Sequence, residues 1–262
     1  MRKLSLLLAG IILLLISCEK NLTNIEKQKG TQEEFLKNVK KRSILKDYSL
    51  NTIVHNPNNN FDEIGKLHNY GCDILLIKMK KLNFSQKEFN EKVFFTELYN
   101  IADSMNIELK DSSLQEIPMK RMFENNSFVE EENLNKLQKE GLIDKYEKEY
   151  INSLKNMALQ CTSLNELQNK IVKFENKVLN KNTLSKTEKE TILYSTSILR
   201  YSSAYWASKG LNTTQAKGWG EFIGVCLGDA MGFVVGNGIL PGGGGLAGAI
   251  GMSFAANAAC AS

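Results

Sequence analysis

The sequence predicts an all-α protein, an amphipathic helical bundle followed by a C-terminal Gly/Ala-rich helical hairpin. Three observations favour this class. Apolar residues recur with the 3.6-residue period of a helix through the middle of the chain, and only three prolines occur in 262 residues. No stretch of useful length alternates apolar and polar residues, as a half-buried strand would. The C-terminal segment is rich in glycine and alanine, which predicts the hairpin.

The N-terminus has the organisation of a secretory signal. The basic pair Arg2-Lys3 precedes an uncharged run from Leu4 to Ile16, which is shorter than the roughly 20 residues that span a bilayer. The run ends in Leu15-Ile16-Ser17-Cys18, which resembles the lipobox of bacterial lipoproteins. The resemblance implies that residues 1–17 are removed and that Cys18 becomes a lipid-carrying N-terminus. An uncleaved anchor with an incidental cysteine is the alternative.

Three further segments follow the signal. Residues 18–31 are polar and lack apolar periodicity, so they predict a tether between the membrane and the folded part. Residues 32–210 predict a helical domain, and residues 211–262 predict a hairpin packed on it. The formal net charge of +4 is small and no strongly basic stripe is present, which argues against nucleic acid as a partner.

Seven helices are expected in the helical domain, four of them (32–47, 61–80, 85–105 and 163–179) because apolar residues recur at helical spacing. Two of them begin with a Ser-x-x-Glu capping box, at Ser85 and at Ser185. Asn56-Pro57 and Gly141 predict breaks, and Pro118 interrupts a weak signal over residues 111–126. The expected ranges are 32–47, 61–80, 85–105, 130–139, 142–160, 163–179 and 185–208.

The C-terminal segment differs from the rest of the chain. From Phe222 to Ser262 the only charged side chain is Asp229. Glycine recurs at every fourth residue, which on a helix aligns the missing side chains along one ridge and lets another helix approach closely. This ridge resembles the glycine zipper of membrane-associated helices. Its members are Gly220, Gly224, Gly228, Gly232 and Gly236.

A second helix completes the predicted hairpin. Pro241 and the four glycines after it predict a turn, and a helix is expected to resume from Leu246 to Ala259. The hairpin is either the buried core of a soluble helical domain or a segment that enters a membrane or a partner's groove. A carboxylate at Asp229 argues against simple exposure to lipid. The small residues that we expect to face the glycine ridge are Ala247, Gly251, Ala255 and Ala259.

Few side chains suggest chemistry. His68 and Cys72 lie four residues apart and so share a helix face, a spacing that can hold a metal. The only other histidine is His55, so a third ligand is lacking and no metal site is expected. A packing role for His68, bonded to a backbone group beside Asp62 or Asn69, is the alternative to a functional one.

Asp229 and the cysteines leave alternatives open. Asp229 is either functional or hydrogen-bonded to Trp219, Tyr205 or a hydroxyl inside the core, and with His68 it forms the candidate polar site. A disulfide between Cys226 and Cys260 is one possibility, and buried free thiols are the other. No phosphate loop, nucleophile elbow or paired-carboxylate motif occurs, so no cofactor is expected. The four cysteines in question are Cys72, Cys161, Cys226 and Cys260.

The helical domain contains the stretch Asn60-Phe61-Asp62-Glu63-Ile64-Gly65-Lys66-Leu67-His68-Asn69. It resembles a segment of secreted or lipid-anchored proteins of Bacteroidetes-type bacteria. Those proteins also place a helical region first and a Gly/Ala-rich hairpin last, with a stretch similar to Asp229-Ala230-Met231-Gly232. The resemblance covers the layout from Asn56 onward and implies architecture and export, without an activity. Glu19-Lys20-Asn21 lacks the acidic cluster that resembles a surface-export tag. The sequence therefore does not indicate on which side of the membrane the protein lies.

These observations predict a non-enzymatic, lipid-anchored protein of the cell envelope with a structural or partner-binding role. Its partners would be the membrane, through lipidated Cys18, and a protein or second copy that packs on the glycine ridge. In a bacterium with two membranes, the outer one is the expected location. The alternative is a toxin- or bacteriocin-like protein that inserts its hairpin into a target bilayer. A hydrolase that uses His68 is a more distant hypothesis.

Overall fold

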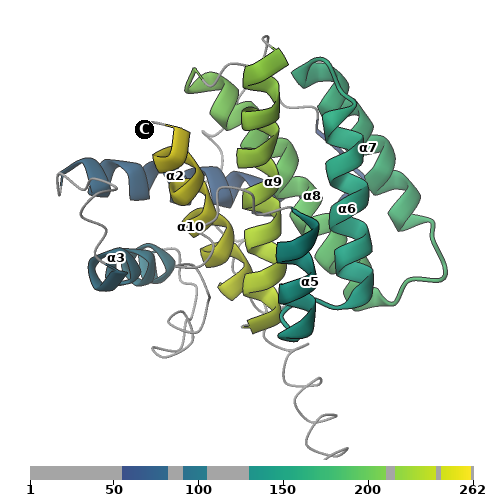
Figure 1. The fold of residues 1–262 in the computed structure, drawn as a ribbon, viewed down its shortest axis with the longest axis horizontal. Coiled ribbons are helices and arrows are strands. Elements are labelled where there is room, and N and C mark those ends of the chain that lie inside the picture. Colours follow the sequence, from purple (N-terminus) through teal and green to yellow (C-terminus); the bar gives the residue numbers. More distant parts are fainter. Residues whose placement is uncertain (1–54, 82–90, 105–129, 211–215, 240–242, 261–262) are drawn as a thin grey trace, which may run out of the picture.

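The computed structural model describes five stretches of the chain, residues 55–81, 91–104, 130–210, 216–239 and 243–260 (Figure 1). Within these ranges the chain forms eight α-helices and no strand, which confirms the predicted all-α class. The lipobox, Cys18, the tether and the expected helix over 32–47 lie outside the described residues. So do the predicted capping box at Ser85 and the weak segment over 111–126.

Most helix boundaries agree with the expected ranges within a few residues; the expected start at Ser85 lies outside the described residues, and the start of the last helix differs. That helix begins at Gly243, inside the predicted turn, so the expectation that it resumes at Leu246 was wrong. The helices are α2 (Asp62–Lys81), α3 (Glu91–Ser104), α5 (Glu131–Lys139), α6 (Lys145–Leu159), α7 (Leu164–Leu179), α8 (Lys186–Ser208), α9 (Ala216–Ile239) and α10 (Gly243–Cys260).

Side-chain caps explain several of these boundaries. The predicted capping box at Ser185 is present, with Ser185 and Glu188 each bonding the other's backbone N–H. A second box, formed by Asp144 and Glu147, begins α6 and was not predicted. The break at Gly141 is confirmed, because its φ of 72° lies in the left-handed region that favours glycine.

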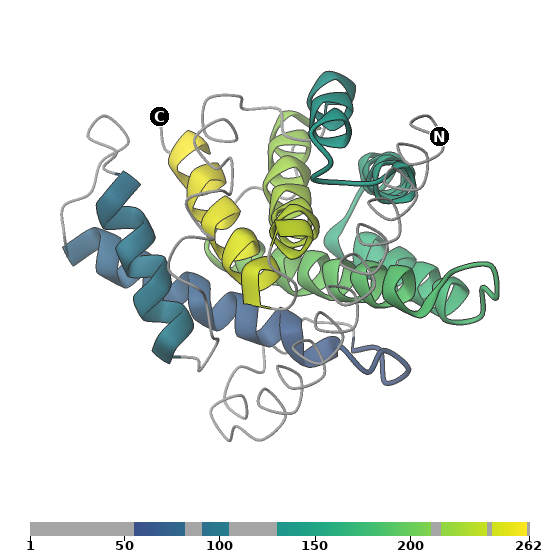
Figure 2. The same ribbon diagram turned by 90° about the horizontal axis from the view of Figure 1, so that it is seen from below.

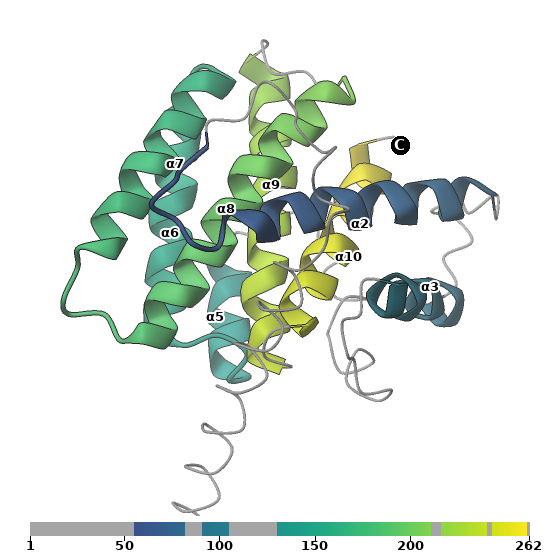
Figure 3. The ribbon, with the colours of Figure 1, turned by 180° about the vertical axis from the view of Figure 1, so that it is seen from behind.

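The hairpin of α9 and α10 occupies the centre of the molecule. Helix α9 packs along α10 and against α8, and it also contacts α6 (Figure 1). Seen from behind, α2 runs across α8 and α10 (Figure 3). From below, α2 and α8 lie along the same side of the hairpin, and α3 crosses one end of α2 (Figure 2). The other helices therefore pack around two almost uncharged ones.

Burial is most complete in the helices that meet at this centre. Every residue of α8 from Thr191 to Trp206 is buried. Among the described residues one helical stretch, Gly218–Gly238 in α9, is long and apolar enough to cross a membrane. In this fold 78% of its apolar window is buried inside the protein. In this structure the hairpin is thus packed as a buried core, which is the first of the two alternatives.

The close approach of α9 and α10 depends on glycines in the second half of the ridge. A methyl group at Gly232 would lie 2.6 Å from the carbonyl oxygen of Gly248, and one at Gly236 would collide with the carbonyl oxygen of Gly244. Among the described residues, no atom outside the backbone of α9 itself lies within 4 Å of a methyl group placed at Gly220 or Gly224. Of these four glycines, α10 contacts Gly232 and Gly236.

The residues of α10 at this contact are Gly244 and Gly248, whereas the sequence pattern had selected Ala247, Gly251, Ala255 and Ala259. Ala247 and Gly251 are buried, and the side chains of Ala255 and Ala259 lie outside the described ones. Glycine costs a helix about 1 kcal/mol relative to alanine, but a methyl group at Gly248 would collide with the carbonyl oxygen of Gly232, so close packing there offsets that cost.

Candidate functional site

The candidate residues His68 and Asp229 meet in the centre of the molecule, where α2, α8, α9 and α10 come together. His68 Nε2 lies 3.6 Å from Asp229 Oδ2 and 3.0 Å from Ser253 Oγ. Ser202 donates a hydrogen bond to Asp229 Oδ2, and Cys72 Sγ lies 3.4 Å from His68 Nε2. We call this group the His68 cluster; its members are His68, Cys72, Ser202, Asp229 and Ser253.

Asn69 determines which nitrogen of His68 carries a proton. Asn69 Nδ2 donates to the carbonyl oxygen of Tyr201 at 3.1 Å, which turns Oδ1 of the same amide toward His68. His68 Nδ1 lies 3.1 Å from that oxygen and must donate to it. In the neutral ring Nε2 is then an acceptor for Ser253. The predicted packing role beside Asn69 agrees with this geometry, although the bond is to the side chain.

Asp229 is held by neutral donors in an apolar environment. Trp206 Nε1 donates to Oδ2 at 3.1 Å, in addition to Ser202. Within the described part of the chain, Asp229 Oδ1 has no hydrogen-bond partner. Burial raises the pKa of Asp229 above its ordinary value, while His68 and the hydrogen bonds from Ser202 and Trp206 oppose that shift. The neutral acid is therefore favoured more than in water.

The expected partners of Asp229 were only partly right. A core hydroxyl does bond it, from Ser202, but the indole is that of Trp206. Tyr205 instead donates to Asp73 at 2.7 Å. Trp219 Nε1 makes no hydrogen bond to the described residues. The sequence could not distinguish these aromatic residues, because the choice depends on how α8 and α9 are rotated against each other.

The His68 cluster does not have the properties of a nucleophilic or metal site. Burial raises the pKa of Cys72 well above its ordinary value, and the charge of Asp229 adds to the effect, so the thiol stays protonated. Among the described residues no group of three or more His, Cys, Asp or Glu side chains could hold a metal ion. His68 and Asp229 are completely buried, so a substrate would have to separate helices to reach them.

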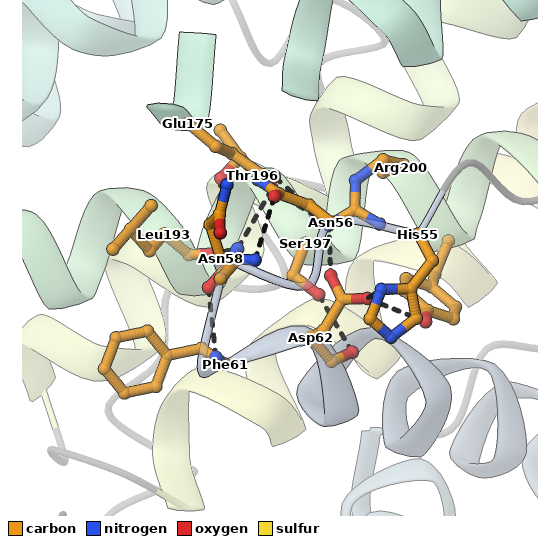
Figure 4. Close-up of polar contacts among 12 residues, drawn as sticks. His55, Asn56, Asn58, Phe61, Asp62, Glu175, Leu193, Thr196, Ser197 and Arg200 are labelled. Carbon is orange, nitrogen blue, oxygen red and sulfur yellow. Dashed lines mark hydrogen bonds and ion pairs between the residues drawn. The ribbon is translucent and has the colours of Figure 1, made fainter. Parts of the chain in front are cut away.

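A second buried polar group, which the sequence did not predict, lies between α2, α7 and α8. Arg200 on α8 bonds the carboxylates of Asp62 and, at 3.0 Å, Glu175, and Figure 4 shows Arg200 and Asp62 pointing toward one another. Asn56 and Asn59 donate to the two oxygens of Glu175 at 2.7 and 3.0 Å. We call this group the Arg200 cluster; its members are Asn56, Asn59, Asp62, Glu175 and Arg200.

The Arg200 cluster fastens the start of α2 to α7 and α8. Burial alone would lower the pKa of Arg200, but the charges of Glu175 and Asp62 raise it above its ordinary value, so the guanidinium stays ionised. His55 Nδ1 lies 3.6 Å from Asp62 Oδ2, and the His55 side chain is largely exposed. His55 therefore belongs to the edge of this cluster and does not join His68 as a metal ligand. A signal was present in the sequence, because Arg200 is the only charged residue between Thr191 and Trp206.

The stretch Asn60–Asn69, singled out in the sequence, faces these two clusters. Asp62 bonds Arg200, while His68 and Asn69 belong to the contacts around Asp229. A methyl group at Gly65 would collide with the ring of Tyr201, so glycine allows α2 to lie directly on α8. The motif is thus used for helix packing.

No family model, curated protein or solved structure matches the chain. The resemblance to lipid-anchored Bacteroidetes-type proteins therefore stays a prediction. Function has to be argued from the geometry of the described helices and from the N-terminal motif. In that geometry His68, Cys72 and Asp229 contact one another and join α2 to α9 and α10.

The cysteines of the described core are free thiols. Cys72, Cys161 and Cys226 are buried and form no disulfide. The suggested disulfide between Cys226 and Cys260 is therefore not formed, and the free-thiol alternative holds for Cys226. Burial raises the pKa of Cys226 well above its ordinary value, with a further contribution from Asp229.

Proposed function

We propose that this chain is a non-enzymatic, lipid-anchored protein of the cell envelope with a structural or partner-binding role. The observation that supports the proposal is that the potentially reactive side chains are buried in contacts between helices. His68, Cys72 and Asp229 are each at most 1% exposed and bond one another or neighbouring helices. An enzyme needs such groups at a surface that a substrate can reach.

The lipobox supplies the anchor in this proposal. Acyl chains on Cys18 contribute about 0.8 kcal/mol for each buried methylene, so two or more chains hold a protein durably on a bilayer. Residues 18–31 would then separate the helical domain from the membrane. This anchor leaves the hairpin free to serve as core, which agrees with the burial of α9 against α8 and α10.

A partner role is supported by the first part of the glycine ridge. Among the described residues, a methyl group at Gly220 or Gly224 would have no neighbour within 4 Å, and Gly220 is exposed. A helix of a partner or of a second copy could approach α9 there as closely as α10 does further along. This surface is where a binding role of the hairpin would be sought.

Membrane flotation is the experiment that tests the proposal. Residues 19–262, which lack the signal and the lipidated cysteine, are mixed with liposomes and centrifuged in a density gradient. We expect the protein to stay soluble, monodisperse and helical at the bottom, and the chain with Cys18 expressed in bacteria to incorporate labelled palmitate. Flotation of residues 19–262 would favour membrane insertion instead, and absence of palmitate would refute the anchor.

Membrane insertion of the hairpin is the second candidate function. The stretch Gly218–Gly238 has the length and apolar composition of a membrane span, and it contains a single carboxyl in its central part, Asp229, whose charged form is costly at bilayer depth. Release of dye from loaded vesicles by residues 19–262 would support it. Vesicles that stay sealed at every concentration and pH tested would exclude it.

A further inference from the structure

A cavity of about 300 Å³ opens between α6, α7 and the beginning of α8. This volume is at the lower end of the range for small-molecule sites. None of its lining residues belongs to the His68 cluster or to the Arg200 cluster. The proposed function gives this cavity no role. Its lining combines aromatic, acidic and basic side chains.

The floor of the cavity is apolar and aromatic. Tyr150 and Phe174 stand with ring centroids 5.7 Å apart and a tilt of 41°, and buried Ile192 lies beside them. The Tyr150 hydroxyl bonds Ser195 Oγ at 3.0 Å and the Ile192 carbonyl oxygen at 3.2 Å. Because this hydroxyl is already bonded to α8, Tyr150 offers the cavity its apolar ring. The floor suits an apolar or aromatic body.

Two carboxylates line the cavity at the beginnings of α6 and α8. Glu147 and Glu188 each accept one backbone hydrogen bond through Oε2, from Asp144 at 2.8 Å and from Ser185 at 2.6 Å. Hydrogen bonds from the Ser185 side chain and backbone lower the pKa of Glu188, so this carboxylate stays ionised. Burial raises the pKa of Glu147 to about 7, and the charges of Asp144 and Glu188 contribute to the shift. A bound ammonium group would relieve this repulsion.

Two lysines provide the opposite charge. Lys177 lies in the last turn of α7, and Lys181 lies in the connection that follows this helix; both side chains are exposed at the cavity. Because both side chains line the same cavity, the two lysines can approach one anion together. The cavity therefore combines an apolar floor with acidic groups from α6 and α8 and basic groups from the end of α7 and the connection after it.

We propose that this cavity binds a small zwitterion with an apolar side chain, of the class of free apolar α-amino acids. The ligand's ammonium group is bonded by Glu147 and Glu188, and its carboxylate by Lys177 and Lys181. Its side chain packs on Tyr150 and Phe174. This inference does not depend on the lipid anchor or on the role of the hairpin.

Binding of four matched probes to the full chain in mild detergent, measured by isothermal titration calorimetry, tests the proposal. Phenylalanine has both charges and the aromatic body, phenethylamine lacks the carboxylate, 3-phenylpropionate lacks the ammonium group, and glycine lacks the body. We expect phenylalanine to bind at least about tenfold more tightly than each of the others, since each lacks one favourable contact. Equal affinities, or no binding of phenylalanine at millimolar concentration, would overturn the proposal.

Charge-removing variants identify the site. Glu188→Gln keeps the capping box, which accepts glutamine, and should weaken phenylalanine binding about tenfold while leaving 3-phenylpropionate unaffected. Lys177→Gln, at an exposed position, should weaken phenylalanine and leave phenethylamine unaffected. Glu132→Gln and Lys136→Gln on exposed positions of α5 are the matched controls. If E188Q and K177Q bind all probes as these controls do, the ligand does not occupy this cavity.

Discussion

Arg200 and Asp229 are each the single charge in a long uncharged run, and the protein stabilises them in different ways. Arg200 is bonded to two carboxylates, from Asp62 on α2 and Glu175 on α7. Asp229 is bonded to a hydroxyl and an indole, with His68 3.6 Å away. Arg200 is therefore kept ionised, whereas the neutral form of Asp229 is made more favourable.

The raised pKa of Asp229 predicts a pH dependence of stability. In the folded state this carboxyl binds its proton above the ordinary value of 3.8. Between that value and the raised pKa, the folded protein holds more protons than the unfolded chain, so the free energy of unfolding falls as pH rises. Asp229→Asn cannot titrate, so it should lose this part of the slope and be at least as stable as the wild type above the window.

Urea unfolding between pH 4 and pH 8 measures this slope. Asp103→Asn is the matched control, because Asp103 is exposed on α3 and its replacement leaves the buried carboxyl in place. The slope of D103N should equal that of the wild type. If D229N retained the wild-type slope as well, burial of Asp229 would not be the cause of the pH dependence.

Local contacts at this scale could be predicted from the sequence, and distant ones could not. The shared face of His68 and Cys72 follows from their spacing along one helix, whereas the orientation of Asn69 depends on Tyr201, 132 positions away. The contact of His68 with Ser253 joins residues 185 positions apart. No periodicity reports such a pairing, because it depends on where α2 crosses the hairpin.

At the scale of helices, α9 offers an internal comparison between two glycines of the same ridge. Gly232→Ala would place a methyl group 2.6 Å from a backbone oxygen of α10, which cannot move without the helix. We expect it to destabilise the protein by about 1 to 3 kcal/mol, as overpacking does. Gly224→Ala meets no atom of the described residues within 4 Å and should stabilise the protein by about 0.5 to 1 kcal/mol through helix propensity.

Thermal and urea unfolding of the two variants make this comparison. Both changes add the same methyl group to the same helix, so helix propensity contributes about equally to each. The difference between them isolates the contact with α10. Equal stabilities for G232A and G224A would mean that α9 and α10 are not in close contact at Gly232.

Helix boundaries were predictable where a cap determines them and less so where packing does. The Ser185 box begins α8 as expected, because its hydrogen bonds are local. The start of α10 at Gly243 contradicts helix propensity, since glycine is a poor helix former. Contact with Gly236 and Phe233 explains it, and that contact exists only after the hairpin has closed.

For the whole molecule, the burial of the thiols predicts how it reacts with alkylating reagents. Cys72 and Cys226 are at most 1% exposed and have raised pKa values, so neither should react with iodoacetamide at pH 8 while the protein is folded. Both lie in the same core and should become labelled together, at the rate of global unfolding.

Peptide mapping by mass spectrometry after timed labelling measures both rates. Cys161 follows α6 in a short connection, so local opening should label it earlier. Labelling of Cys226 well before Cys72 would show that the hairpin opens independently of α2. A Cys226 that stays unlabelled in denaturant without reductant would indicate a disulfide.

The all-α class and the hairpin could be predicted for the whole molecule, whereas the arrangement of the helices could not. Amphipathic stripes indicate that each helix buries one face, but they do not name the partner. Helix α8 lacks a clear stripe because it is buried on all sides from Thr191 to Trp206. The serines, threonines and Arg200 of this stretch are buried. Polar residues are usually exposed, so the sequence alone would not suggest that they lie inside.

The crossing of α2 over α8 also sets a time scale for synthesis. Asp62 and its partner Arg200 are separated by 138 positions. At 5 to 20 residues per second, a ribosome needs about 7 to 28 s to reach Arg200 after it has made Asp62. During that interval Asp62, Ile64 and His68 have no native partners on α8 or α10. A chaperone that binds α2 in nascent chains would therefore act during the translation of α3 to α8.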